Sequence, residues 1–441
     1  SNGNANMLFV DGGDNRVGVG TSSPATTLTV EGSSANGIEL NRNGADATQS
    51  ARLFFDSSTN ASAIYNVGGT LNFASGATPG AGSGTSIFKI ASDGSLSTPT
   101  AGTSNVRFGV NAGNSIASGG NYNVVVGDEA GTAITTGDYN TGVGYKALED
   151  HTTGTRNIAV GSFSLDANTT ASDNTAVGYS GLGANTTGAN NVAFGNHALQ
   201  ANTTASNNTA VGYASLVANT TGTNNVAVGS LALDANTTGG ENTAVGYQSL
   251  SSATTVDNNT AFGYTALRDN TSGTSNLAVG VNTLRLNTTA SNNTGVGAFA
   301  LDVNTTGASN TALGSAALGA NTTGAENTAI GSQAGDALTT GFSNTALGVK
   351  ALSSDTTGRY SVAIGHSALE NQAFTGNNNS YNTAVGYSAG NDVTTGVQNT
   401  LIGGLAGDAL QDADYNVAVG YEALSADTLG SRSTALGRQA L

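Results

Sequence analysis

One short pattern recurs along three-quarters of the chain and constrains its fold more than any other feature. The pattern is Asn, Thr or Val, Ala, an aliphatic residue or Phe, and Gly, and it begins at twenty places between residues 105 and 433. Seventeen of the nineteen steps between successive starts are 17 residues long, and the exceptions are 18 (105 to 123) and 21 (361 to 382). Such a fixed period indicates a repeat architecture in which each unit contacts its neighbours.

The residue types within the repeat predict strands and exclude helix. We number each repeat from position 0, the residue that begins the pattern. Position 3 is always aliphatic or Phe, and position 4 is Gly in all twenty repeats. Alternation through Thr-Ala-Val-Gly-Tyr has the period of two that is typical of a strand, whereas a Gly inside a helix costs about 1 kcal/mol. We therefore predict an all-β fold, with a parallel β-solenoid of about twenty 17-residue coils over residues 105–441.

A compensating substitution indicates that these coils enclose a packed interior. Most repeats carry Leu at position 8 and a polar residue at position 11. Five repeats have Gly at position 8, and each has an aliphatic residue at position 11: Gly113/Ile116, Gly131/Ile134, Gly335/Leu338, Gly390/Val393 and Gly407/Leu410. Near-constant packing density requires a space vacated at one position to be filled from another. A disordered low-complexity segment would have no reason to compensate in this way.

From this alternation we predict a core ladder formed by positions 3 and 8. Its representative members are Val143, Leu148, Val177, Leu182, Val211, Leu216, Val245 and Leu250. Each coil then buries only about one Val and one Leu, so we expect further burial against other copies of the chain. The small residues at positions 2 and 4 would permit close approach. We expect a homo-oligomer, most simply a homotrimer.

Charge and composition exclude several classes of partner. The chain has 29 Asp and Glu against 13 Lys and Arg, a net charge of −16. Nucleic acid and anionic membranes both require clustered basic residues, and no apolar segment approaches the ~20 residues that span a bilayer. Because the chain has no cysteine, disulfides and thiolate metal sites are excluded. We expect no nucleic acid, no membrane insertion and no cofactor.

Residues 1–104 lack the period and are predicted to form a small β-rich module. The segment Ala74–Thr85 is rich in Gly, Ser and Ala and is predicted to be a loop. The segment Asp11–Asn15 could bind Ca²⁺ through its oxygen atoms, but a tight hairpin turn explains it better. The strand-like segments are Met7–Val10, Ile38–Leu40, Arg52–Phe55 and Ser86–Ile90.

No arrangement of residues in the repeats predicts catalysis. The three histidines, His151, His197 and His366, occupy different positions of the repeat and so form no column of metal ligands. Asp166 and Asp234 share position 9 but lie four coils apart, about 19 Å at one strand spacing per coil. Paired acid and base carboxylates must lie closer than that. We therefore predict that the protein is not an enzyme.

The most distinctive local feature is the repeat that begins at Ser361, which carries four extra residues. Binding residues are concentrated in loops of this kind, although a harmless insertion explains the extra residues better. The candidate binding residues are Phe374, Asn377, Asn378, Asn379 and Tyr381. The Asn-Thr-Thr tripeptides that begin at Asn168 and Asn185 match the N-glycosylation pattern, but Asn and Thr also suit a turn.

Two parts of the chain resemble known families. The segment from Asn15 to Pro24, followed by Leu28–Val30, is similar to a motif of bacteriophage tail-fibre proteins. Repeats such as Asn242-Thr243-Ala244-Val245-Gly246-Tyr247 resemble the head repeats of trimeric autotransporter adhesins and the repeat regions of tail fibres. The resemblance implies a left-handed β-roll assembled as a trimer, extracellular on a virion or a bacterial cell surface. It implies attachment to a host-surface glycan or protein receptor.

Two other functions fit the same sequence. An ice-binding or surface-binding solenoid would present a flat threonine array, and position 1 is Thr in twelve repeats but Val, Ile or Leu in the other eight. A self-assembling extracellular filament would use the same coils as a spacer. The chain also ends in the middle of its twentieth coil, so we expect further sequence after Leu441.

Overall fold

The structure, a computed structural model, describes residues 102–376 and 378–440 together with eight strands in the N-terminal part. Contacts divide the chain into two units, Ser1–Pro99 and Thr100–Leu441. Every regular element in the described residues is a β-strand, which confirms the predicted all-β class.

The N-terminal unit contains two small sheets. In the first, β1 and β2 pair antiparallel on either side of the segment predicted to form a hairpin, and β3 pairs parallel to β2. In the second, β4 to β8 form an antiparallel meander. The predicted strand Ile38–Leu40 lies outside the described residues, as does most of the predicted loop, whose first residues belong to β6. The strands are β1 (Phe9–Asp11), β2 (Arg16–Val19), β3 (Leu28–Val30), β4 (Arg52–Phe55), β5 (Ala61–Val67), β6 (Thr70–Ala77), β7 (Thr85–Ile90) and β8 (Leu96–Ser97).

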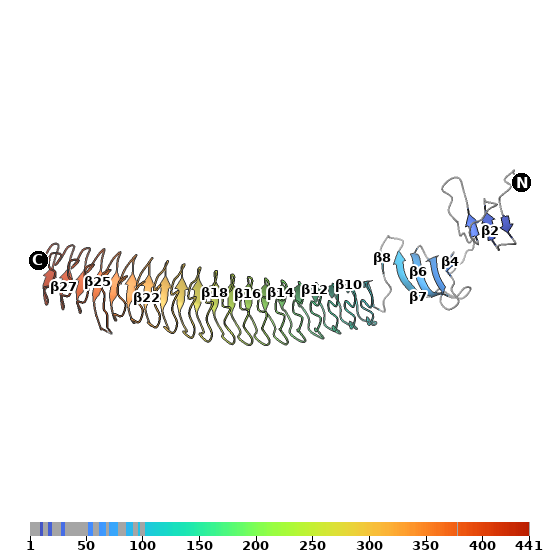
Figure 1. The fold of residues 1–441 in the computed structure, drawn as a ribbon, viewed down its shortest axis with the longest axis horizontal. Helices are drawn as coiled ribbons and strands as arrows, with labels where there is room; N and C mark the ends of the chain where they lie inside the picture. Colours follow the sequence, from blue (N-terminus) through green and yellow to red (C-terminus); the bar gives the residue numbers. More distant parts are fainter. Residues whose placement is uncertain are drawn as a thin grey trace. The chain divides into compact units, whose positions relative to one another are not determined.

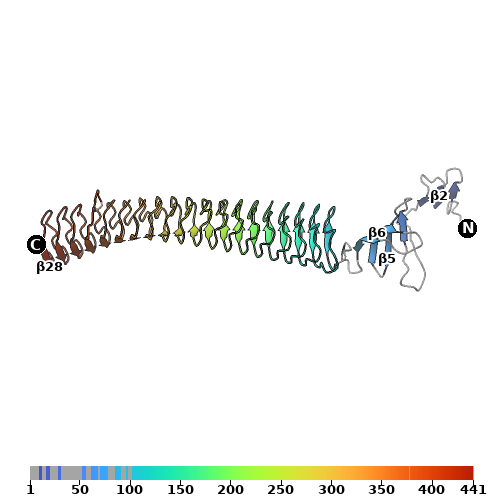
Figure 2. The same ribbon diagram turned by 90° about the horizontal axis from the view of Figure 1, so that it is seen from below.

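The second unit is a parallel β-solenoid, as predicted. Each coil contributes one three-residue strand at positions 1 to 3, and each strand pairs in parallel and in register with the next, so the strands stack in one row (Figures 1 and 2). The strands are β9 (Val106–Phe108), β10 (Val124–Val126), β11 (Thr141–Val143), β12 (Ile158–Val160), β13 (Thr175–Val177), β14 (Val192–Phe194), β15 (Thr209–Val211), β16 (Val226–Val228), β17 (Thr243–Val245), β18 (Thr260–Phe262), β19 (Leu277–Val279), β20 (Thr294–Val296), β21 (Thr311–Leu313), β22 (Thr328–Ile330), β23 (Thr345–Leu347), β24 (Val362–Ile364), β25 (Thr383–Val385), β26 (Thr400–Ile402), β27 (Val417–Val419) and β28 (Thr434–Leu436).

The remaining residues of each coil form turns with a repeated backbone pattern. The residues at positions 6, 8 and 16 have positive φ angles near 50–60°, as at Ala214, Leu216 and Asn224. Gly at position 4 has a φ near 135°, which side-chain-bearing residues rarely adopt; for Gly212 it is 132°. The backbones of successive coils also meet there, because a Cβ on Gly212 would lie 2.6 Å from the carbonyl oxygen of Gly229. Both constraints explain why position 4 is always Gly.

The interior contains only one half of the predicted core ladder, the leucines at position 8. Leu at position 8 fills it, and Leu148, Leu182, Leu216 and Leu250 are fully buried, as predicted. The strand residue that faces inward is the Ala at position 2, such as Ala210, which is also fully buried.

The prediction was wrong for the valines at position 3. They lie on the outer face of the sheet and are only half-buried, because the strand alternates and Ala takes the inward place. The valines concerned are Val143, Val177, Val211 and Val245. The small residues at position 2 therefore cannot line an interface with another chain.

The compensating substitution fills the interior as predicted, and a strand residue at position 2 also takes part in it. Ile134 at position 11 is fully buried beside Gly131. A Cβ on Gly131 would lie 2.7 Å from Cδ1 of Ile134 and 2.6 Å from Cγ1 of Val125. Val125 replaces the usual Ala at position 2. The Gly at position 8 thus makes room for larger side chains at both other inward positions.

Candidate binding surface

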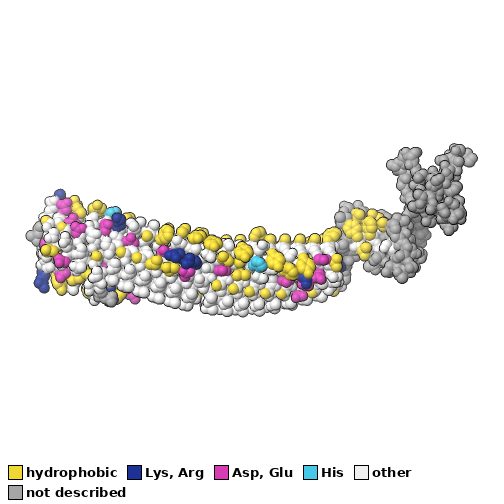
Figure 3. All heavy atoms as spheres, viewed as in Figure 1, with side chains coloured by type: hydrophobic (Ala, Val, Ile, Leu, Met, Phe, Trp, Pro, Cys, Tyr) yellow, Lys and Arg dark blue, Asp and Glu magenta, His cyan; other side chains and the backbone are white. Residues whose placement is uncertain are grey.

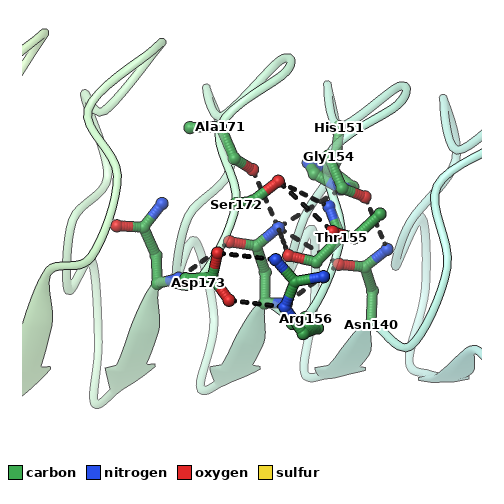
Figure 4. A network of polar contacts seen from close by, with 10 residues as sticks. Asn140, His151, Gly154, Thr155, Arg156, Ala171, Ser172 and Asp173 are labelled. Carbon is green, nitrogen blue, oxygen red and sulfur yellow. Dashed lines mark hydrogen bonds and ion pairs between the residues drawn. The ribbon is translucent and has the colours of Figure 1, made fainter.

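A buried column of Asn side chains at position 0 holds each coil closed and joins it to the next. The Nδ2 of Asn208 donates to the carbonyl oxygen of Gly222, at the end of the same coil, at 2.9 Å. Its Oδ1 accepts the backbone N–H of Asn225, which begins the next coil, at 2.9 Å. Figure 4 shows the same arrangement around Asn140. The column satisfies backbone groups that no strand reaches, so it serves the fold and is closed to ligands.

A second buried column runs along position 11 and includes the first Asn of the Asn-Thr-Thr tripeptides. Asn219 Nδ2 donates to the Oδ1 of Asn202 at 2.9 Å and to the carbonyl oxygen of Gly222 at 3.0 Å. Asn168 and Asn185 are fully buried in the same column. The folded chain therefore hides the amide nitrogens that glycosylation would modify.

His151 belongs to this second column. Its Nδ1 accepts from Asn168 Nδ2 at 2.9 Å, and its Nε2 therefore donates to the carbonyl oxygen of Gly154 at 2.9 Å (Figure 4). Burial lowers the pKa of His151 below its ordinary value. Both ring nitrogens are engaged, so the ring replaces an Asn side chain. No cluster of three His, Asp or Glu side chains suited to a metal occurs among the described residues.

The insertion predicted to bind a receptor is partly interior. Phe374 is 1% exposed and packs inside the coil, so its assignment as a surface contact was wrong. The extra residues displace the turn and bring this ring into the space below Gly358, where a Cβ would lie 2.9 Å from it. Asn378 and Asn379 are exposed, as is Tyr381, and Asn377 lies outside the described residues.

A buried carboxylate anchors this irregular coil. Asp355 Oδ1 accepts the backbone N–H groups of Thr357, Gly358 and Phe374, and its Oδ2 accepts Gln372 Nε2 at 2.6 Å. Burial is the largest influence on the Asp355 carboxyl and raises its pKa despite these donors. Four donors and no acceptor face this group, which explains a carboxylate where other coils carry Asn.

An aromatic row runs along the turn that follows the strands. Successive rings meet edge to face at centroid distances of 5.3 to 6.2 Å. Tyr at position 5 alternates with another ring at position 6 in the next coil, which explains why Tyr recurs every 34 residues here. The rings are Tyr145, Phe163, Tyr179, His197 and Tyr213.

A long exposed apolar feature is the outer face of the sheet, whose position 3 side chains the sequence interpretation had placed inside. We call the side chains at positions 1 and 3 of β9 to β28 the outer stripe. Every one of them is Thr, Val, Ile, Leu or Phe. Phe194 is 56% exposed, Phe262 55% and Leu313 46%. Figure 3 shows hydrophobic side chains in bands along the solenoid. Contiguous apolar surface patches are common at interaction sites of proteins.

The fold therefore defines a parallel β-solenoid repeat protein with an uncharged outer stripe. Comparison with family models, curated proteins and solved structures finds no match to this chain. Within the described residues, no helix has the length and apolar character to cross a membrane.

Proposed function

We propose that the chain is a subunit of a non-catalytic attachment fibre in which three copies pack along their outer stripes. The stripe is the observation that carries this proposal. It continues over twenty strands, which at one strand spacing per coil is about 90 Å. A soluble protein gains stability by removing such a surface from water, at about 25 cal/mol per Å² of apolar area.

Further copies of the same chain are the occupants that fit this stripe. A partner must match both its length and its 17-residue period to cover the stripe without gaps, and the chain itself has both. None of the forty stripe side chains is charged, although the chain carries a net charge of −16. Packing stripe against stripe places the like charges on the outside, where water screens them. Closed cyclic symmetry gives each copy the same environment.

In an attachment fibre, the exposed residues at the irregular coil would contact the receptor. Tyr360 and Tyr381 stack with centroids 5.2 Å apart and planes 4° apart, and both remain exposed. Asn379 Nδ2 donates to the hydroxyl oxygen of Tyr381 at 3.4 Å. Exposed aromatic rings beside amide groups suit a host-surface glycan or a protein receptor. The proposal places the fibre outside the cell, on a virion or on a bacterial surface.

The first test is the native mass by light scattering. We expect about three times the chain mass of 43.2 kDa. Replacing Val211 and Val245 with Asp puts charges into the stripe and should yield monomers. The matched control replaces Thr221 and Thr238, which are exposed in the turn, with Asp and should leave the trimer intact. A monomeric wild-type protein at micromolar concentration would overturn the proposal.

Ice binding predicts a different result. An ice-binding face needs free hydroxyls, but position 12 threonines use theirs internally: Thr186 Oγ1 donates to the carbonyl oxygen of Thr203 at 3.1 Å. The outer stripe interrupts its threonines with bulky residues such as Ile158 and Leu277. We expect no thermal hysteresis. Electron microscopy distinguishes the remaining alternative, since a filament subunit would give open-ended polymers instead of particles of one length.

A further inference from the structure

A pocket of about 330 Å³ opens on the turn side of the solenoid, within the aromatic row. Three consecutive coils contribute to it through positions 5, 6, 9 and 10, so it does not share residues with the outer stripe. Phe163 and Tyr179 supply its aromatic walls, and Asp166 and Gln200 supply its polar groups. Its full lining is Phe163, Asp166, Tyr179, Ser180, Gly183, Ala184 and Gln200.

Two small residues create this pocket. Gly183 occupies position 9, where the equivalent residue two coils later is Val217 and two coils earlier is Glu149. Ser180 occupies position 6 between the rings of Phe163 and His197 in the neighbouring coils. The missing side chains leave a hollow beside the rings of Phe163 and Tyr179, which meet edge to face. A Cβ on Gly183 would lie 3.3 Å from Oδ1 of Asp166.

The charge of the pocket is unbalanced. Burial raises the pKa of the Asp166 carboxyl, and repulsion from Glu149 and Asp150 adds to this effect. No Lys or Arg pairs with Asp166 among the described residues. At the same position of another coil, Asp302 is paired with Arg285 at 2.8 Å. Asp166 is therefore a partly desolvated carboxylate without an ion-pair partner of its own among the described residues, since the nearby Lys146 is paired with Glu149 at 2.9 Å and with Glu129 at 3.3 Å.

We propose that this pocket binds an alkylated ammonium cation, such as the trimethylammonium group of choline. Such a cation is weakly hydrated and favours aromatic rings, with an attraction of about 0.5–2 kcal/mol per ring. The carboxylate of Asp166 supplies the opposite charge, and the pocket has the volume for a group of this size. An anion would meet repulsion from the Asp166 carboxylate that lines the pocket, and a neutral sugar would leave that carboxylate without a cation.

A second site in the chain provides a natural negative comparison. Eight coils further on, Phe299, Asp302 and Gly319 repeat the ring, the carboxylate and the missing side chain. Ser315 stands there in place of Tyr179, and the carboxylate is already neutralised by Arg285. The inference therefore assigns the binding site to the pocket at Asp166 and not to its counterpart at Asp302.

The test titrates the full chain with choline chloride and with its neutral isostere 3,3-dimethyl-1-butanol, observed by ligand NMR. We expect choline to bind with a Kd of about 1 mM and the alcohol to bind at least about tenfold more weakly, a difference of about 1.4 kcal/mol. Equal binding of the two, or binding of methyl glucoside in preference to choline, would overturn the proposal.

Variants locate the site. Asp166→Asn should weaken choline binding at least about tenfold, and Gly183→Val should abolish it by introducing the side chain that Val217 carries in the same place. Asp234→Asn, at position 9 of a coil without the pocket, should bind as the wild type does. Unchanged binding by Gly183→Val, with a thermal transition like that of the wild type, would exclude this pocket. The readout is independent of oligomeric state, so it separates this inference from the trimeric fibre.

Discussion

Gly212 and its counterparts at position 4 lie where the backbone of one coil touches the next. Gly212→Ala would combine an unfavourable φ of 132° with a Cβ only 2.6 Å from a carbonyl oxygen. We expect a loss of about 2–4 kcal/mol in the free energy of unfolding, measured as a lower urea midpoint. Gly181→Ala is the matched control, because a Cβ there meets its nearest atom at 3.6 Å. A Gly212→Ala midpoint equal to that of Gly181→Ala would contradict this account of position 4.

Leu182 illustrates a second residue-scale constraint, since it is fully buried although its φ is 51°. That left-handed conformation disfavours Leu, and its persistence indicates that core filling outweighs the backbone strain. Leu182→Ala should therefore lower the free energy of unfolding by about 2–5 kcal/mol. Leu231 has a similar φ of 56° but is only half-buried, so Leu231→Ala should have a smaller effect on the same urea midpoint. Equal losses would mean that burial at position 8 is not decisive.

At the scale of single residues, the sequence predicted the turns and the burial of Leu at position 8. It did not predict which face of each strand points inward. Alternation divides a strand into two faces without labelling them. The decisive signal lay in the rare large residues at position 2. Leu401 replaces Ala there, and the facing residues Gly390 and Gly407 are the ones that lack side chains at position 8. A Cβ on either would lie 2.7 Å from Leu401.

At the scale of the coil, closure depends on one side chain. Asn208→Ala would leave the buried N–H of Asn225 without its acceptor and the carbonyl of Gly222 with one donor fewer. We expect a loss of about 2–4 kcal/mol, seen as a lower thermal midpoint by circular dichroism. Asn207→Ser is the control, because Asn207 is exposed and Ser309 occupies the same position in another coil. If both variants melt together, the column does not hold the coil closed.

The candidate binding segment shows why coil-level details escaped sequence reasoning. The four extra residues marked an irregular coil, and exposure of Asn378, Asn379 and Tyr381 agrees with a surface role. Phe374 was misplaced because an aromatic residue in a polar segment is equally consistent with a surface contact and with a core plug. Only the space left at Gly358 decides between them.

At the scale of the whole molecule, carboxyls that burial has perturbed set a dependence of stability on pH. Burial raises the pKa of Asp234, Asp336 and Asp408. The folded chain then binds their protons more tightly than the unfolded chain does, so their contribution to stability is present at low pH and is lost as pH rises through the raised values. Replacing all three with Asn should raise the thermal midpoint more at pH 7.5 than at pH 3.5, which lies below the ordinary carboxyl pKa.

The control for this prediction is Asp173, a carboxyl whose pKa is shifted in the opposite direction. Arg156 lowers the pKa of Asp173 through a hydrogen-bonded ion pair at 2.6 Å. Its contribution is present above the ordinary carboxyl pKa and is lost as pH falls. Asp173→Asn should therefore give no gain at pH 7.5. Equal gains for the triple variant at both pH values would show that these three carboxyls are not perturbed in the folded state.

The outer stripe was the largest feature that sequence reasoning missed at this scale, and the reason is physical. Position 3 looked like core because it is aliphatic or Phe throughout, as in Phe194 and Leu313. Apolar side chains occur on exposed faces of folded proteins as well as in their interiors. A single sequence therefore cannot separate an apolar outer face from an interior when both have the same period.

The coils that stack by way of Asn208 and its counterparts differ little from one another. Because each coil bonds only to its two neighbours, one coil can be added or removed while the strand pairing and the Asn column are kept, although a single coil would break the alternation of rings in the aromatic row. Each such change alters the length of the rod by about 4.8 Å. The number of repeats thus sets the length of the solenoid, and this length changes in whole units when repeats are gained or lost.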